Sequence, residues 1–227
     1  AARLLAPFLR TARVPKAHKE ILERGIGEYI AVQAFNAERP ETRLNLGTLY
    51  AGMGRDREAG LAYRQALRLQ PRFVPARINL AQLLSEGGRE ADAVTVLEEG
   101  IALDSADASL QHAMGLSLIR RKRQEEALEH LAAAAREAPG VSRYAYVHGV
   151  ALVSGGNRDA GLKVLAQAQR RHPGDTDILL ALVSYHREAG HSKEALAYAR
   201  SLRDVMPGDP QLERLIGELE RGGVSGG

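Results

Sequence analysis

The segment PETRLNLGTLYAGMGRDREAGLAYRQALRLQPRF, residues 40–73, is followed by four further segments of the same length that align with it without gaps. The five windows are 40–73, 74–107, 108–141, 142–175 and 176–209. A fixed period of this length is typical of solenoids, in which each unit is one helix pair that buries its apolar face against the next unit. We therefore predict an all-α repeat protein whose function is to hold a partner.

Small residues recur at the same places in each window. The eighth position holds Gly47, Ala81, Gly115, Gly149 and Val183, and the twentieth holds Ala59, Ala93, Ala127, Gly161 and Ala195. Side chains of this size let two helices approach to the short end of the roughly 8 to 10 Å range of interaxial distances. We expect larger residues, such as Leu46 at the seventh position and Tyr63 at the twenty-fourth, to fill the core between them.

Helix-ending residues also recur. The fifteenth position holds Gly54, Gly88, Gly156 and Gly190, with Lys122 as the exception, and the thirty-second holds Pro71, Pro139, Pro173 and Pro207, with Ser105 as the exception. A glycine in the left-handed conformation commonly ends a helix, and a proline cannot continue one. Each window is therefore predicted to contain two helices, the first ending at the glycine and the second before the proline.

This pattern resembles the tetratricopeptide repeat. The motif L-G-x-x-Y stands as LGTLY at 46–50, and Ala59, Tyr63, Ala66 and Pro71 follow at the family's spacing. The resemblance implies a right-handed α-α superhelical solenoid of five repeats that acts as a non-catalytic protein-protein interaction scaffold.

The segments outside the five repeats are expected to be mostly helical. We predict N-terminal helices within 1–39, with a half repeat from Lys16 to Arg39 and a short helix over 1–13 left from an upstream domain. The half repeat is expected to cap the first repeat through Ile21, Ile26, Tyr29, Ile30 and Val32. A capping helix is predicted over 210–221, with an apolar stripe of Leu212, Leu215, Ile216 and Leu219, and a flexible tail over 222–227. The same stripe offers a surface for a weak homodimer; otherwise the chain is a monomer.

Composition excludes several classes of protein. The chain has 44% hydrophobic and 26% charged residues, which is the composition of a folded globular chain, and it lacks cysteine. It contains no stretch of about 20 apolar residues, so we expect no membrane span. The net charge is +3 and the densest basic run is RRKR at 120–123, but Glu125 and Glu126 follow at once and no aromatic residue interrupts the run, so nucleic acid is not the expected partner. Ala1 is expected to mark a cut inside a longer chain.

No pattern of catalytic or metal-binding residues was found. The sequence lacks a phosphate-binding loop, a nucleophile elbow, a zinc-binding H-E-x-x-H helix and a haem-attachment motif. His148 and His186 fall at positions that usually hold core leucine or tyrosine, so we interpret them as packed and hydrogen-bonded. We predict no enzyme activity, no cofactor and no metal site.

Binding is expected on the concave face, which the first helix of each pair lines. The residues predicted to form this groove are Asn45, Asn79, Gln82, His112, Leu116, Arg120, Arg143, Tyr146, Val150, Val153, Leu180 and Arg187. The mixture of apolar side chains with three arginines indicates a peptide or protein segment that carries apolar anchors and some negative charge. Asn45 and Asn79 match the asparagine ladder of glycosyltransferase-associated repeats, whereas the residues of a chaperone clamp are mostly absent.

A second resemblance concerns the order of segments along the whole chain. AARLLAPFLR, EYIAVQAFNAERPETRLNLGTLY and SRYAYVHGVAL are similar to the C-terminal region of bacterial proteins in which multihaem cytochrome c and HEAT-like segments precede tetratricopeptide repeats. This resemblance implies an alternative function, a docking domain that packs on a sister domain of a larger protein, and a periplasmic location. Without it, we expect a cytoplasmic adaptor.

Overall fold

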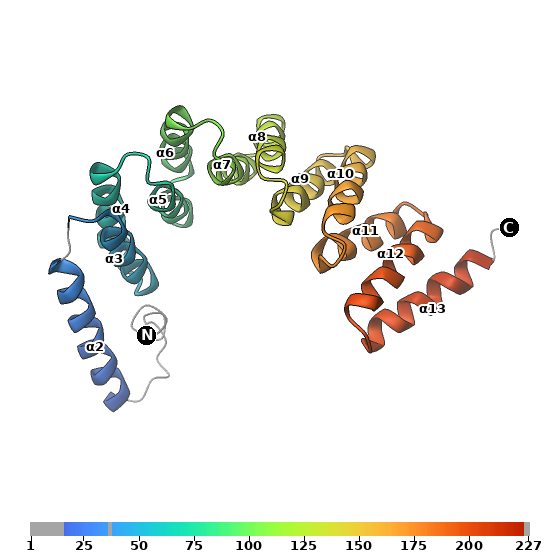
Figure 1. Ribbon diagram of the computed structural model, residues 1–227, viewed down its shortest axis with the longest axis horizontal. Coiled ribbons are helices and arrows are strands. Elements are labelled where there is room, and N and C mark those ends of the chain that lie inside the picture. Colours follow the sequence, from blue (N-terminus) through green and yellow to red (C-terminus); the bar gives the residue numbers. More distant parts are fainter. Residues whose placement is uncertain (1–15, 36–37, 225–227) are drawn as a thin grey trace. The chain divides into compact units, whose positions relative to one another are not determined.

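The computed structural model describes residues 16–35 and 38–224, and within these ranges the chain is all helical (Figure 1). The helices are α2 (Lys16–Phe35), α3 (Pro40–Gly52), α4 (Asp56–Leu69), α5 (Val74–Glu86), α6 (Glu90–Leu103), α7 (Ala108–Arg120), α8 (Gln124–Glu137), α9 (Ser142–Ser154), α10 (Arg158–Arg171), α11 (Thr176–Glu188), α12 (Ser192–Val205) and α13 (Pro210–Val224). The chain divides into two compact units between Arg123 and Gln124. The third window therefore contributes α7 to unit 1 and α8 to unit 2.

Unit 1 is a stack of helix pairs. Helix α3 packs on α4 and α5 packs on α6, while α4–α5 and α6–α7 contacts join successive elements. The first helices also touch one another, α3 with α5 and α5 with α7. A row of first helices therefore forms one side of this unit.

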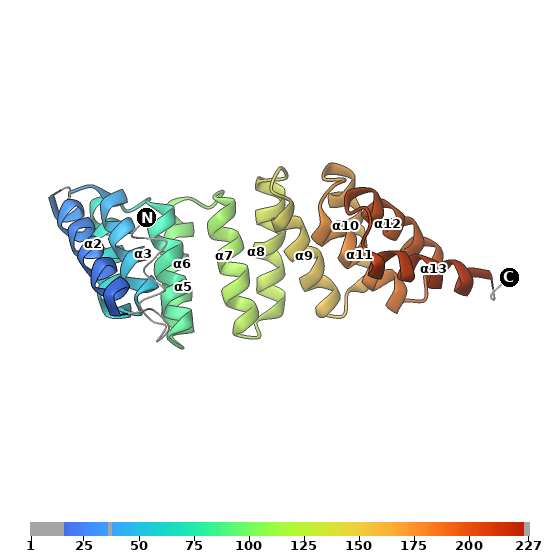
Figure 2. The ribbon, with the colours of Figure 1, turned by 90° about the horizontal axis from the view of Figure 1, so that it is seen from below.

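Unit 2 follows the same plan. Helices α9 and α10 form one pair, α11 and α12 form the next, and α8 and α13 pack at the two ends (Figure 2). The first helices α9 and α11 are again in contact. The predicted all-α architecture of repeated helix pairs is confirmed in the described residues.

The turn inside each pair uses the left-handed backbone conformation expected of the fifteenth position. The φ angles are +73° at Gly54, +74° at Gly88, +87° at Gly156 and +75° at Gly190. Lys122, the exception in sequence, takes the same conformation with φ +60°. Its neighbours close the turn in the same way, since Arg123 N–H donates to the Leu118 carbonyl at 2.9 Å, as Arg55 N–H does to Tyr50. The repeat therefore imposes this turn even where the residue is unsuited to it.

Glycine at the eighth position allows the two helices of a pair to touch. A Cβ atom on Gly47 would lie 2.4 Å from the ring of Tyr63, and one on Gly149 would lie 2.6 Å from Leu165 Cγ. Alanines at the twentieth position, such as Ala59 and Ala127, are completely buried. The large core residue of one helix thus packs directly against the backbone of the other, because any side chain there would separate them.

Helix α2 covers the first pair through fewer residues than the sequence suggested. Ile26 is buried against Leu49, with Tyr29 and Ile30 packed beside it. Ile21 and Val32 were expected to join this contact, but they are 59% and 60% exposed. The helix also ends at Phe35 instead of Arg39. The short helix predicted over 1–13 lies outside the described residues.

Helix α13 covers the last pair. Leu212, Ile216 and Leu219 are buried in one cluster with residues of α11 and α12, and Leu215 packs against its edge. The stripe proposed as a dimer surface is therefore largely occupied within the chain. The helix reaches Val224, so the first residues of the predicted flexible tail are helical.

A buried arginine, which the sequence did not single out, joins three parts of unit 1. The side chain of Arg77 on α5 is 5% exposed, and it donates hydrogen bonds to the carbonyls of Val96 at 2.9 Å and Pro71 at 2.8 Å. It also pairs with Glu99 at 3.1 Å. A Cβ on Gly100 would lie 2.3 Å from Arg77 Cδ, so the glycine makes room for the arginine stem. Arg77 thereby ties α5 to α6 and to the turn that precedes it.

Replacing Lys122 with glycine is expected to stabilise the protein by about 1 kcal/mol. The left-handed conformation costs a residue with a Cβ roughly 1–2 kcal/mol, part of which is offset by the greater backbone entropy that glycine loses on folding. Urea unfolding of the full chain measures the change. The matched control is Gly88→Ala, which places a Cβ at the equivalent turn in open space and should destabilise. A destabilised Lys122→Gly variant would contradict the role given to this turn.

Arg77→Met is expected to destabilise the protein by about 2–4 kcal/mol. The substitution keeps an apolar stem beside Gly100 but leaves two carbonyl groups without their donor. Thermal and urea unfolding, compared with the exposed-site control Arg68→Met, test this expectation. Equal stability of the two variants would show that water replaces the guanidinium at no cost.

Candidate functional site

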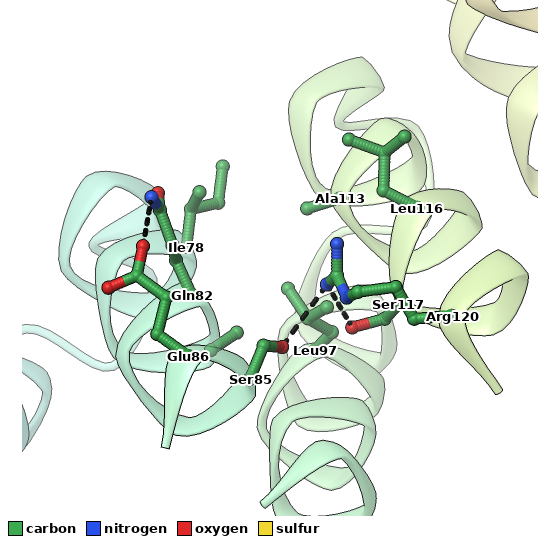
Figure 3. Close-up of a pocket in the computed structure, with 10 residues that line it drawn as sticks. Ile78, Gln82, Ser85, Glu86, Leu97, Ala113, Leu116, Ser117 and Arg120 are labelled. Carbon is green, nitrogen blue, oxygen red and sulfur yellow. Dashed lines mark hydrogen bonds between the residues drawn. The ribbon is translucent and has the colours of Figure 1, made fainter. Parts of the chain in front are cut away.

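An open cavity of about 400 Å³ lies between α5 and α7 in unit 1 (Figure 3). The residues that line it are Ile78, Ala81, Gln82, Ser85, Glu86, Leu97, Ala113, Leu116, Ser117 and Arg120. We call it the α5–α7 groove. Gln82, Leu116 and Arg120, three of the predicted binding residues, meet here.

Helical periodicity explains why these residues share one cavity. On α5 the residues 78, 81, 82 and 85 are spaced i, i+3, i+4 and i+7, and on α7 the residues 113, 116, 117 and 120 have the same spacing. Residues at these intervals lie on one face of a helix. The two faces look toward each other, and Leu97 of α6 contributes from the second helix of the pair.

One end of the α5–α7 groove is polar and internally paired. Arg120 Nη2 donates to the hydroxyls of Ser85 and Ser117, both at 3.1 Å, and Arg120 Nε donates to Glu90 at 3.1 Å. The Ser117 hydroxyl donates to the same carboxylate oxygen at 2.6 Å. In Figure 3 the remaining terminal nitrogen of Arg120 has no hydrogen bond to the other residues drawn and points into the space between α5 and α7. The groove thus ends in one positioned donor.

Glu90 is held in its ionised form. Partial burial opposes ionisation, but hydrogen bonds from Ser117 and Ser85 and the neighbouring Arg120 outweigh it and lower the pKa of Glu90. The charge of Arg120 is therefore balanced at neutral pH. The opposite wall is also internally bonded, because Gln82 Nε2 donates to Glu86 at 2.9 Å.

Three other predicted residues of unit 1 lie outside this groove. Asn79 Nδ2 donates to the Thr48 hydroxyl at 3.4 Å, which links α5 to α3. Asn45 and His112 are half-buried and do not line the cavity. The Asn79 side chain thus links two first helices and does not face the groove.

Tyr146 and Val153, two of the predicted residues of α9, contribute to packing in unit 2. Tyr146 is half-buried and lies against the core cluster that contains Leu165, Ile178 and Leu182. Burial raises the pKa of Tyr185 on α11, and the adjacent Tyr146 adds to the increase. Val153 contacts Gly161 of its own helix pair, where a Cβ would lie 2.5 Å from Val153 Cγ2. Arg143 is exposed and Val150 is half-buried, and neither lines a described cavity.

A second cavity, of about 520 Å³, lies between α11 and α13 in unit 2. We call it the α11–α13 groove, and it is lined by Leu180, Val183, Arg187, Leu202, Met206, Asp209, Gln211, Leu212, Arg214, Leu215 and Glu218. The predicted residues Leu180 and Arg187 both lie here. The sequence pattern predicted α13 as a cap and a dimer surface, and did not predict that it lines a groove with α11.

Helix α13 behaves like the first helix of a sixth repeat. Asp209 caps it by accepting hydrogen bonds from the N–H groups of Gln211 and Leu212, as Asp175 does from Ile178 at the start of α11. The two aspartates are separated by one repeat period. Extending the 34-residue alignment past 209 would have placed Gln211, Arg214 and Glu218 at groove positions.

His148 and His186 were predicted to be packed and hydrogen-bonded, and the structure differs from this prediction at one atom. His186 is packed, with its ring stacked on Tyr198 at 5.5 Å and 5.6 Å from the ring of His191. Its Nδ1 atom is buried and has no hydrogen bond within the described residues, so the predicted hydrogen bonding is wrong at this atom. Burial lowers the pKa of both His148 and His186, which keeps these rings uncharged at neutral pH.

The described residues were compared with the requirements of a metal site and of a membrane span. Across 16–35 and 38–224, no three histidine or acidic side chains come together in a group able to hold a metal ion. In the same ranges, no helix combines the length and apolar character that crossing a membrane requires.

Comparison with known proteins places the chain in a family. A sequence model described as tetratricopeptide repeat matches residues 44–109 and 146–211, together more than half of the chain. The chain belongs to the tetratricopeptide repeat family. The first matched range covers most of α3 and all of α4, α5 and α6, and includes the α5 wall of the α5–α7 groove.

Solved structures of other proteins resemble this tetratricopeptide repeat protein in fold. PilF of Pseudomonas aeruginosa matches with a TM-score of 0.65 and 20% identity over 82% of this chain and 87% of PilF. MamA matches with a TM-score of 0.61 and 19% identity over 71% of this chain and 94% of MamA. YrrB, described as a TPR protein with an unusual peptide-binding site, matches with a TM-score of 0.58 and 17% identity over 85% of this chain and 97% of YrrB.

These comparisons establish fold and not partner. No curated protein sequence matches the chain. The resemblance to multihaem cytochrome c proteins receives no support from the family match or from the solved structures.

The Glu90 cluster predicts a stability difference that depends on pH. Because the folded state lowers the pKa of Glu90, ionised Glu90 stabilises the fold above its unfolded pKa of about 4.3, and this contribution disappears as pH falls through the lower folded value. Glu90→Gln should therefore be less stable than the parent protein at pH 7, and the difference should shrink below about pH 4. Urea midpoints between pH 3 and pH 7 measure it, with exposed Glu98→Gln as the control. A stability difference between Glu90→Gln and the parent protein that stays constant from pH 3 to pH 7 would contradict the pairing of ionised Glu90 with Arg120, Ser85 and Ser117.

Proposed function

We propose that this tetratricopeptide repeat protein is a non-catalytic scaffold that binds a segment of a partner protein in the α5–α7 groove. The observation that carries the proposal is an open cavity with an apolar base and one positioned donor, built from the first helices of two successive repeats. Membership of the family supports a protein-binding function.

The side chains of the groove indicate what the segment looks like. Ile78 and Leu116, which are half-buried, offer apolar surface for an aliphatic or aromatic anchor above the buried Leu97. The free nitrogen of Arg120 suits a carbonyl or carboxylate oxygen at one end of that segment. Because Glu90 already balances Arg120, binding energy comes mainly from apolar burial, and the polar end sets the direction of the chain.

The α11–α13 groove is proposed to hold a second segment of the same kind. Leu180 is exposed beside Leu215, and Arg187 and Arg214 accompany them with the acidic Glu218. Tyr146, Val150 and Arg143 on α9 remain proposed contact residues in the same unit, with Tyr146 serving the core as well. Burying one aliphatic anchor contributes about 1.5–3 kcal/mol, whereas micromolar affinity requires about 8 kcal/mol beyond the cost of association, so backbone and polar contacts must add to two or three anchors.

Filling the α5–α7 groove tests the proposal. Ala113→Trp places an indole ring in the cavity and should weaken a bound peptide at least tenfold, whereas Ala102→Trp makes the same change at an exposed alanine outside it. Peptides are selected with the full chain from a random phage-displayed library, and their affinities are measured by fluorescence anisotropy. Urea midpoints of both variants check that the fold is retained.

Two results would count against the proposal. Peptides that bind the parent and Ala113→Trp equally would place binding elsewhere. Failure to select any peptide would favour the alternative, in which the repeats pack on a sister domain of a longer chain.

A further inference from the structure

Helix α5 has a second face, which lines a separate cavity. This cavity, of about 410 Å³, lies between α4 and α5 and is lined by Asp56, Arg57, Gly60, Leu61, Arg64, Leu80, Leu83, Leu84, Gly87 and Arg89. It shares no residue with the α5–α7 groove, because 80, 83 and 84, with Gly87 just after the helix, lie on one side of α5, and 78, 81, 82 and 85 lie on another. We call it the α4–α5 cavity.

A glycine forms part of the lining of this cavity. On α4, the residues 57, 60, 61 and 64 are spaced i, i+3, i+4 and i+7 and therefore share one face. A Cβ on Gly60 would lie 3.2 Å from Arg64 Nη1 and 3.6 Å from Leu83 Cδ2. The guanidinium group and the leucine thus approach the helix backbone where a side chain is missing. Leu61 beside them is 51% exposed, which leaves apolar surface available to a ligand.

The charges around the cavity are not balanced. Arg89 pairs with Asp92 at 2.6 Å, and the nearby Arg55 pairs with Glu58 at 2.8 Å. Among the described residues, no ion pair or hydrogen bond holds the guanidinium of Arg57 or Arg64. Asp56 is the first residue of α4, where a carboxylate interacts favourably with the helix dipole. Two unpaired guanidinium groups therefore flank a leucine-lined hollow.

We propose that the α4–α5 cavity binds an acidic segment of a partner protein, with one aliphatic side chain between Leu61 and Leu83 and flanking carboxylates on Arg57 and Arg64. Guanidinium groups bind carboxylates in a bidentate geometry, and such pairs are among the stronger hydrogen-bonded contacts in proteins. The site is independent of the α5–α7 groove, so either is testable without the other.

The residues that line the α4–α5 cavity suit an acidic protein segment better than a nucleic acid or an anionic membrane. No aromatic side chain is present in it to stack on a base, as single-stranded nucleic acid binding would require. Four leucines surround a concave site, which suits an inserted aliphatic side chain better than the flat array of headgroups on an anionic membrane.

The test uses a fluorescein-labelled peptide with the sequence Gly-Glu-Glu-Leu-Glu-Glu-Gly and the full chain at about 50 mM salt, where screening is moderate. Fluorescence anisotropy should show binding that weakens as salt rises. Arg57→Glu and Arg64→Glu should each weaken it at least tenfold, and Leu61→Ser at least threefold. Arg68→Glu, on the same helix but outside the cavity, should change it less than twofold. Gly60→Met, which fills the cavity and leaves all charges in place, should also weaken binding at least tenfold.

Two matched peptides distinguish binding in the α4–α5 cavity from nonspecific electrostatic attraction to the protein. Replacing the peptide leucine with serine should weaken binding at least threefold, and replacing the glutamates with lysines should abolish it. No binding of the acidic leucine peptide would overturn the proposal, as would equal losses for Arg68→Glu and Arg64→Glu. Tight binding of oligothymidylate or of phosphatidylserine vesicles, with the peptide failing to compete, would replace it with a nucleic-acid or membrane surface.

Discussion

The contact between a bulky side chain of one helix and the bare backbone of its partner is the constraint on which the rest of this structure depends. The ring of Tyr63 against Gly47 and the side chain of Leu165 against Gly149 leave no room for a Cβ atom. These contacts set the distance between the two helices of a pair. Because the two helices of a pair pack closely on their inner faces, their outer faces remain available to contact the neighbouring pairs. The stack can therefore grow by repetition.

The grooves follow from the same geometry. Because the first helices lie in a row, each presents a face with the spacing i, i+3, i+4 and i+7 to the next one. The α5–α7 groove and the α11–α13 groove are therefore equivalent places in the repeat, although one is built from two true repeats and the other from a repeat and the terminal helix. Their different side chains give one scaffold two surfaces of different chemistry.

Polar groups in unit 1 serve to hold these surfaces in place. Arg77 uses its buried guanidinium to connect the carbonyls of two segments, and Arg120 uses most of its donors on Glu90, Ser85 and Ser117. Residues that a sequence presents as free positive charges are thus partly used inside the protein. Arg57 and Arg64 differ from them, since their guanidinium groups remain unpaired beside an open cavity.

The sequence by itself determined the helix pairs, the turns and the glycine and alanine contacts, because these depend on spacing within one repeat. It also indicated Gln82, Leu116 and Arg120, since groove positions follow from the same spacing. Only the tertiary structure decided which polar side chains are already paired, that Val153 contacts Gly161, that Ile21 and Val32 stay exposed, and that α13 forms a groove wall. Those outcomes depend on which side chains of different helices meet, and the pattern of small and apolar positions within a repeat does not specify this. The charge state and openness of each cavity therefore had to come from the packed helices.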